Sequence, residues 1–186
     1  MIKLYQTRRE LYQTTLPING IGAELGVADG TNALDLISIT KPRKLFLCDP
    51  WPDHYAGAFK DFSSVSKLFA TDKTVQIVRE FDYDWLSTLE NKFLDWAYLD
   101  TDHTYETTVK ELNALCDKVR LVIAGHDFCC TAGTLHPFIS GWNGGVMRAV
   151  IEAIQVGQLE LIAITSPING CSAMDGYPSW ACRVLS

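Results

Sequence analysis

One short stretch of the sequence has residue types that could hold a charged small ligand. Glu24 is followed by Gly26, Asp29 and Gly30, where an apolar run ends and a helix-like segment begins. Glycine lacks a Cβ atom and tolerates positive φ, so such a turn lets the backbone approach a ligand closely. The helix that follows adds free N–H groups, and a carboxylate at Glu24 can accept hydrogen bonds from ammonium or hydroxyl groups.

The spacing of this turn favours some nucleotides over others. It reads Glu-x-Gly-x-x-x-Gly, and the G-x-G-x-x-G spacing of dinucleotide sites does not occur, which counts against NAD. Asp49 follows the next apolar run, where nucleoside-binding α/β folds place the acid that holds the ribose hydroxyls. The alternative is structural: Asp49 begins a turn with Pro50, and Glu24 caps a helix.

A second group of residues has the side chains of a metal or acid–base site. Asp100, Asp102 and His103 lie together, and His126 and Asp127 follow about one strand later. Carboxylates and imidazoles can bind a divalent cation, and a bound cation lowers the pKa of a coordinated hydroxyl. In the alternative interpretation, Asp102 and His103 cap a helix that begins near Tyr105, and His126 is a hydrogen-bonded polar residue.

Alternating strands and helices would position both groups. Apolar runs rich in β-branched and aromatic residues predict strands at Gly22–Gly26, Lys44–Cys48, Thr74–Arg79, Trp96–Asp100, Val119–Ala124, Glu160–Thr165 and Ala181–Leu185. Helix-like periodicity or composition lies between them at Thr31–Ile39, Tyr55–Phe69, Trp85–Leu89, Tyr105–Leu115 and Gly145–Ile154.

This order predicts an α/β, Rossmann-like, mostly parallel sheet with helices on both faces. Residues 1–186 are expected to form one domain, with residues 1–20 as an N-terminal extension. The last two strands lack a helix between them and predict an antiparallel hairpin that ends the sheet. Because ligands bind beyond the carboxyl ends of parallel strands, we expect the acids that follow the strands to converge on one rim.

The composition of the chain and the absence of certain motifs argue against several classes of protein. The net charge of −6 and the scattered basic residues argue against a nucleic-acid partner. No run approaches the length of a membrane span, and the first residues have no apolar core like that of a signal peptide, so neither feature is expected. Six cysteines without a C-x-x-C pair predict free thiols and a cytoplasmic location. A G-x-S-x-G elbow and a phosphate-binding G-x-x-x-x-G-K-[ST] loop are absent, which disfavours a serine hydrolase and a nucleoside triphosphatase.

Five blocks of the sequence form an ordered set: Glu24–Gly30, Leu47–Trp51, Trp96–Glu106, Val122–Phe128 and Gly145–Val150. In their order and spacing, these blocks resemble the successive motifs of class I S-adenosylmethionine-dependent methyltransferases. The most similar branch is the small group with a D-x-D-H block and a G-H-D block, related to macrocin-type and catechol-type O-methyltransferases.

The resemblance implies a seven-stranded sheet whose last strand is antiparallel. It implies a methionine-side pocket at Glu24, Gly26, Asp29 and Gly30, with the ribose on Asp49, and it assigns the adenine pocket to Asp82 and a further cofactor contact to Asp100.

In metal-using relatives, the residues that match Asp100, His126 and Asp127 hold Mg²⁺, and Asp102 is a candidate base. This chain carries Thr101 where the branch has glycine and His126 where macrocin-type enzymes have an acid. Histidine is a softer ligand, so Mg²⁺, Mn²⁺, another divalent cation or no metal all stay open.

The resulting expectation is an S-adenosylmethionine-dependent O-methyltransferase of a small hydroxylated molecule, assisted by a divalent cation. Asp102 or His103 would deprotonate the acceptor. The alternative is a non-catalytic module that binds S-adenosylmethionine or S-adenosylhomocysteine on the same fold. We expect a small-molecule substrate, without nucleic acid or membrane partners, and self-association into a homo-oligomer stays open.

Overall fold

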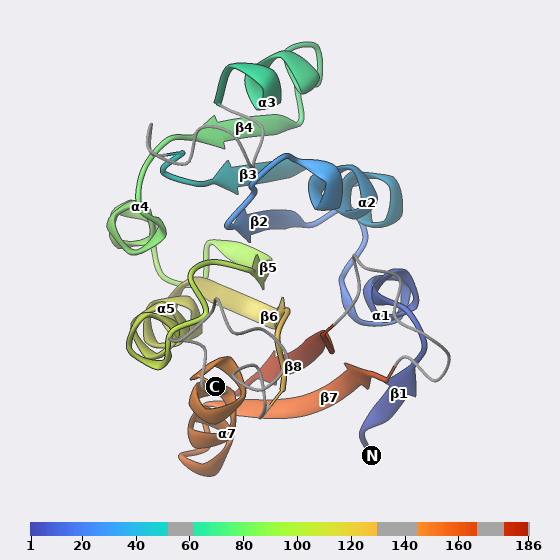
Figure 1. Ribbon diagram of the computed structural model, residues 1–186, viewed down its shortest axis with the longest axis vertical. Helices are drawn as coiled ribbons and strands as arrows, with labels where there is room; N and C mark the ends of the chain where they lie inside the picture. Colours follow the sequence, from blue (N-terminus) through green and yellow to red (C-terminus); the bar gives the residue numbers. More distant parts are fainter. Residues whose placement is uncertain (52–61, 130–144, 167–176, 186) are drawn as a thin grey trace, which may run out of the picture.

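A computed structural model describes residues 1–51, 62–129, 145–166 and 177–185. Strands and helices alternate along most of the chain (Figure 1). The elements are β1 (Lys3–Tyr5), α1 (Arg8–Thr15), β2 (Ile21–Leu25), α2 (Thr31–Thr40), β3 (Lys44–Cys48), α3 (Phe62–Leu68), β4 (Val75–Val78), α4 (Asp82–Thr88), β5 (Leu94–Leu99), α5 (Tyr105–Lys118), β6 (Val119–Gly125), α7 (Gly145–Gln155), β7 (Leu159–Thr165) and β8 (Trp180–Val184).

The strands form one sheet of eight in the order β1-β7-β8-β6-β5-β2-β3-β4. Neighbouring strands are parallel except where β8 pairs antiparallel with both β6 and β7. The predicted α/β Rossmann-like class and the antiparallel last strand are therefore confirmed. The predicted count of seven strands is wrong, because β1 adds an eighth strand at the edge beside β7.

Helices cover both faces of the sheet, with α4, α5 and α7 on one side and α1 and α2 on the other (Figure 1). Alternation along β5 explains this arrangement, since Ala97 and Leu99 pack in one core cluster while Trp96 and Tyr98 pack in the other. Every residue of β5 is buried, as expected for a central strand covered on both faces.

One expectation about the last two strands needs revision. The antiparallel pairing of β7 with β8 is confirmed, but this pair does not end the sheet, because β1 pairs with β7 and forms the edge. The first twenty residues, expected only as an extension, contain β1 and α1, and Leu11 and Tyr12 of α1 are fully buried. The part of the predicted helix Tyr55–Phe69 that precedes Phe62 lies outside the described residues.

The central strands end together at one edge of the sheet. The Gly26 N–H donates to the Cys48 carbonyl (2.9 Å), the Asp100 N–H donates to the Leu25 carbonyl (2.8 Å), and the His126 N–H donates to the Leu99 carbonyl (3.2 Å). The ends of β2, β3, β5 and β6 are thereby held side by side, which is the edge where α/β sheets bind ligands. None of the helices in the described ranges has the length and apolar character needed to cross a membrane.

Candidate active site

The glycine turn after β2 is held against the ends of the neighbouring strands. Gly26 has φ = 80°, and a Cβ atom there would overlap the carbonyl oxygen of Asp100. Asp49 fixes the turn from β3, since its Oδ2 accepts hydrogen bonds from the N–H groups of Val27 (2.9 Å) and Ala28 (3.0 Å). The close contact with the Asp100 carbonyl therefore requires a glycine at position 26. The same contact places the turn directly beside Asp100.

The other two residues predicted for this turn begin α2. Gly30 is the N-cap residue of α2 with φ = 79°, and it provides no side-chain cap. Asp29 compensates, because its Oδ1 accepts a hydrogen bond from the Thr31 N–H (2.9 Å). Both residues thus shape the start of the helix that faces the turn.

Glu24 is buried at the end of a chain of hydrogen bonds from the N-terminal helix. The Tyr12 hydroxyl donates to Asn32 Oδ1 (2.8 Å), and Asn32 Nδ2 donates to Glu24 Oε1 (2.9 Å). Burial, together with the nearby Asp100 and Asp49 carboxylates, raises the pKa of Glu24 to about 8. Its Oε2 has no hydrogen-bond partner among the described residues, so this oxygen could accept a bond from an ammonium group.

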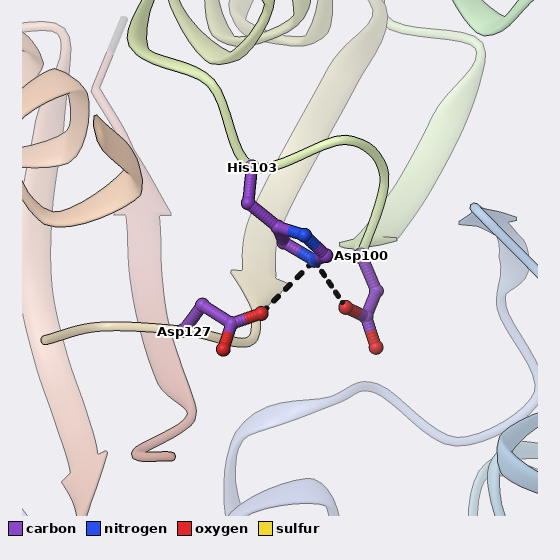
Figure 2. A group of neighbouring side chains, drawn as sticks. All are labelled: Asp100, His103 and Asp127. Atoms are coloured by element: carbon purple, nitrogen blue, oxygen red, sulfur yellow. Dashed lines mark hydrogen bonds and ion pairs between the residues drawn. The ribbon is translucent and has the colours of Figure 1, made fainter. Parts of the chain in front are cut away.

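His103 joins the two carboxylates at the ends of β5 and β6. Figure 2 shows its ring between Asp100 and Asp127, with one nitrogen facing both side chains. Nε2 lies 2.9 Å from Asp100 Oδ1 and 2.9 Å from Asp127 Oδ2. His103 and Asp127 both adopt positive φ, 62° and 59°. These backbone conformations are uncommon for residues with side chains and occur often at functional sites.

The imidazole of His103 and the carboxylates of Asp100 and Asp127 stabilise one another in their charged forms. Burial alone would lower the pKa of His103, but its hydrogen bonds to Asp100 and Asp127 raise it to about 10. Burial would raise the pKa of Asp127, but hydrogen bonds from His103 and His126 hold it well below its usual range. In the absence of other ligands, His103 is therefore an imidazolium between two carboxylates at neutral pH.

Asp102 and His126 lie apart from the centre of this cluster. Asp102 is exposed and accepts hydrogen bonds from the Thr104 N–H (2.9 Å) and the Thr107 hydroxyl (2.8 Å) at the start of α5. His126 Nδ1 is 3.3 Å from Asp127 Oδ2 and 4.0 Å from Asp100 Oδ1. Its Nε2 is buried without a hydrogen-bond partner in the described part of the chain.

Asp82, predicted for the adenine pocket, is the first residue of α4 and is buried. Its neighbour is Glu111 of α5, a fully buried acid that the sequence analysis did not single out. A signal for Glu111 existed, because it shares the buried face of α5 with Thr108, Leu112 and Leu115. A charged residue at such a position usually has a buried polar partner.

The donor atoms around His103 fit a divalent cation. Asp100, His103 and Asp127 each offer one ligand atom, and these atoms lie within 4.8 Å of one another. Two carboxylates and an imidazole suit borderline first-row ions better than Mg²⁺. The structure brings His103 into this group, where the sequence analysis placed His126.

Comparison with known proteins assigns the chain to a class. The family model of the methyltransferase domain matches residues 23–128, more than half of the chain. The chain belongs to this family, and its fold is that of class I S-adenosylmethionine-dependent methyltransferases. No curated protein matches the sequence significantly.

Solved structures share the fold at low sequence identity. SMU.1697c of Streptococcus mutans, in complex with SAH, is 11% identical, with a TM-score of 0.66 and full coverage of both chains. Aeropyrum pernix fibrillarin, with natively bound S-adenosyl-L-methionine, is 11% identical with a TM-score of 0.64, over 94% of this chain and 72% of that one. A Clostridium thermocellum protein assigned as an rRNA methylase is 11% identical with a TM-score of 0.65, over 96% and 93%.

Proposed function

We propose that this chain methylates a hydroxyl group of a small molecule with S-adenosylmethionine as the methyl donor. One observation carries the proposal: the glycine turn after β2 lies against Asp100, which is joined to Asp127 through His103. A donor bound at the turn would therefore have its reactive methyl group beside a cluster of two carboxylates and an imidazole. Positioning of this kind supplies much of the rate of a transfer reaction.

The residues at the turn fit the parts of the donor. The buried, unpaired Oε2 of Glu24 is an acceptor for the ammonium group of the methionine moiety. Asp49 would accept a hydrogen bond from a ribose hydroxyl at Oδ1, which keeps one lone pair beside the bond from the Trp51 N–H, since Val27 and Ala28 already donate to Oδ2. Asp82 would line the adenine pocket, and Gly26, Asp29 and Gly30 would shape the backbone around the donor.

The transfer is a displacement in which an oxygen lone pair of the acceptor forms the new C–O bond. The sulfonium sulfur keeps the electron pair of the broken S–C bond, which yields S-adenosylhomocysteine. The hydroxyl proton passes to the Asp100 carboxylate, because His103 already carries its proton, and from there to water. Asp102 is the other candidate base, but Thr104 and Thr107 hold its carboxylate.

A divalent cation would be held by Asp100, His103 and Asp127, with His126 as an alternative imidazole ligand beside them. When bound, it would lower the pKa of a coordinated acceptor hydroxyl. This arrangement supports placement in the D-x-D-H branch of O-methyltransferases. The net charge of −6 supports a small-molecule acceptor over a nucleic acid.

The test is a methyl-release assay with a panel of hydroxylated small molecules and an RNA arm, run with chelator and with added Mg²⁺, Mn²⁺ or Zn²⁺. Asp100→Ala should abolish turnover while calorimetry still detects binding of S-adenosylhomocysteine. Equal turnover in chelator would remove the cation from the proposal, and methylation of RNA alone would overturn the small-molecule acceptor.

A second candidate is a binding module that holds the cofactor without catalysis. The observation in its favour is that Asp102 is engaged at the start of α5 and the His103 Nε2 already contacts two carboxylates. Tight binding of S-adenosylmethionine without methyl release against the whole panel would favour this module.

A further inference from the structure

Two buried carboxyl groups meet between α4 and α5. Asp82 begins α4 and Glu111 lies on the buried face of α5, with 7% and 0% of their surfaces exposed. The Asp82 Oδ2 and Glu111 Oε2 atoms both lack a hydrogen-bond donor among the described residues, and the two side chains are hydrogen-bonding neighbours. Two carboxylates cannot both be ionised at such a contact without a large cost, but one shared proton satisfies both oxygens.

The electrostatic surroundings favour this protonated pair. Burial, followed by the hydrogen bond and the charge of Asp82, raises the pKa of Glu111 to about 9. The acids that face Glu111 are Asp82, from α4, and Asp102, from the loop before α5. Both disfavour a second negative charge, so the proton resides on Glu111 at neutral pH.

The second oxygen of Glu111 connects this pair to the catalytic loop. The Thr101 hydroxyl donates to Glu111 Oε1 over 2.7 Å. Thr101 directly follows Asp100, so this bond ties the loop that carries Asp100 to α5.

The first carboxyl of the pair adjoins the proposed adenosine site. The Cys48 thiol is buried at the end of β3. Burial and the nearby charges of Asp82 and Asp49 raise the pKa of this thiol. Asp82 therefore lies near the carboxylate proposed for the ribose. Glu111 is the hydrogen-bonding neighbour of the Asp82 carboxyl group, while Phe81, the N-cap residue of α4, provides no side-chain cap.

We infer that Glu111 is a positioning residue of the cofactor site, which through one shared proton orients Asp82 toward the adenine and through Thr101 anchors the loop that carries Asp100. This role rests on the proposed function, because it assigns Asp82 to the adenine pocket. Glu111 touches neither the donor nor the acceptor and acts through its two neighbours.

The experiment is calorimetric titration of the full chain with S-adenosylhomocysteine from pH 6.5 to pH 9.5. Glutamine at position 111 can donate to Asp82 and accept from Thr101, whereas leucine can do neither. We expect Glu111→Leu to weaken binding at least tenfold at pH 7 and Glu111→Gln to recover most of that loss. Both proteins should bind more weakly as the ammonium group of the ligand loses its proton, but the wild-type affinity should fall more steeply above about pH 9, where Glu111 is deprotonated as well.

Controls separate this role from a general loss of structure. Asp117→Asn changes an exposed acid of the same helix and should bind like the wild type at every pH. Thermal melts of each variant at pH 7 verify that it is folded under the titration conditions.

Either of two results would overturn this inference and leave the proposed function standing. One is wild-type affinity in Glu111→Leu, and the other is a decline in affinity above pH 9 that is as steep in Glu111→Gln as in the wild type. A wild-type chain that binds neither S-adenosylhomocysteine nor S-adenosylmethionine would instead overturn the proposed function, and this inference with it.

Discussion

At the scale of single residues, His103 holds together two acids that would otherwise repel each other. Its ring nitrogen contacts carboxylates from the ends of two adjacent strands, and a positive φ of 62° turns the side chain toward them. The positions of the acids and the histidines after the strands predict that they gather at this edge of the sheet. The sequence does not rank His103 over Asp102 and His126, because the direction of each side chain depends on backbone angles that the residue types do not reveal.

His103→Gln tests this electrostatic role. The pKa of His103 is raised above its unfolded value, so its stabilising contribution is complete below about pH 6.5 and is lost as the pH rises through about 10. In chelator, we expect the variant to be less stable than the wild type by about 3 kcal/mol at pH 6, since removing one partner leaves buried charge uncompensated. Denaturant unfolding at pH 6, 8 and 10 should show the difference shrinking, and a difference that grows with pH would contradict this role.

Glu24→Gln tests the buried acid at the glycine turn. The folded protein keeps the Glu24 proton up to about pH 8, whereas the unfolded chain releases it near 4.5. The wild type should therefore lose roughly 4 kcal/mol of stability between pH 5 and pH 9 that the variant retains. Calorimetry should meanwhile show at least tenfold weaker binding of S-adenosylhomocysteine, because the ammonium group of the ligand favours the ionised form of Glu24, which the amide cannot adopt. A variant that is destabilised at pH 9 would show that Glu24 is ionised and paired in the folded state.

At the scale of elements, the site depends on how closely the ends of β2 and β5 approach each other. Most strand boundaries agree with the sequence analysis to within one or two residues, and β3 agrees at both ends. These strands are apolar runs between turn residues, which is the strongest signal for a buried strand. The short strand β1 was missed because its three residues lie at a sheet edge and are mostly exposed, so they carry no apolar pattern.

Gly26→Ala tests the contact between these strand ends. Gly26 and Gly157 have nearly equal φ values, 80° and 78°, but an added Cβ would overlap the Asp100 carbonyl at Gly26 and meet nothing within 4 Å at Gly157. The control Gly157→Ala should therefore cost only the backbone strain, about 1 kcal/mol. Gly26→Ala should cost about 3 kcal/mol or more, because strain and a steric overlap add. Equal losses in thermal or denaturant unfolding would contradict the close approach.

At the scale of the whole molecule, the alternation of elements predicted the fold class, while the strand order came only from the structure. The insertion of β8 between β6 and β7 depends on pairings between distant segments, which local residue patterns do not specify. The same holds for the N-terminal segment. Its helix α1 contributes few apolar residues, but Leu11 and Tyr12 fill the face of the sheet behind Glu24.

Leu11→Ala tests whether the N-terminal helix belongs to the core. Leu11 is fully buried, whereas Leu4 of β1 is 60% exposed. Truncation of Leu11 should reduce the free energy of unfolding by about 3 kcal/mol, and Leu4→Ala should change it by less than about 0.5 kcal/mol. Equal small effects in denaturant unfolding would show that the first helix is dispensable for the core.

The central claim is that the edge formed by β2, β3 and β5 binds S-adenosylmethionine with its methionine end beside Glu24 and its methyl group beside Asp100. The most direct measurement is a calorimetric titration of the wild type and Glu24→Gln with S-adenosylhomocysteine at pH 7.5. We predict one binding site per chain in the wild type and at least tenfold weaker binding in the variant. Absence of binding to the folded wild type, or equal affinity in the two proteins, would contradict the claim.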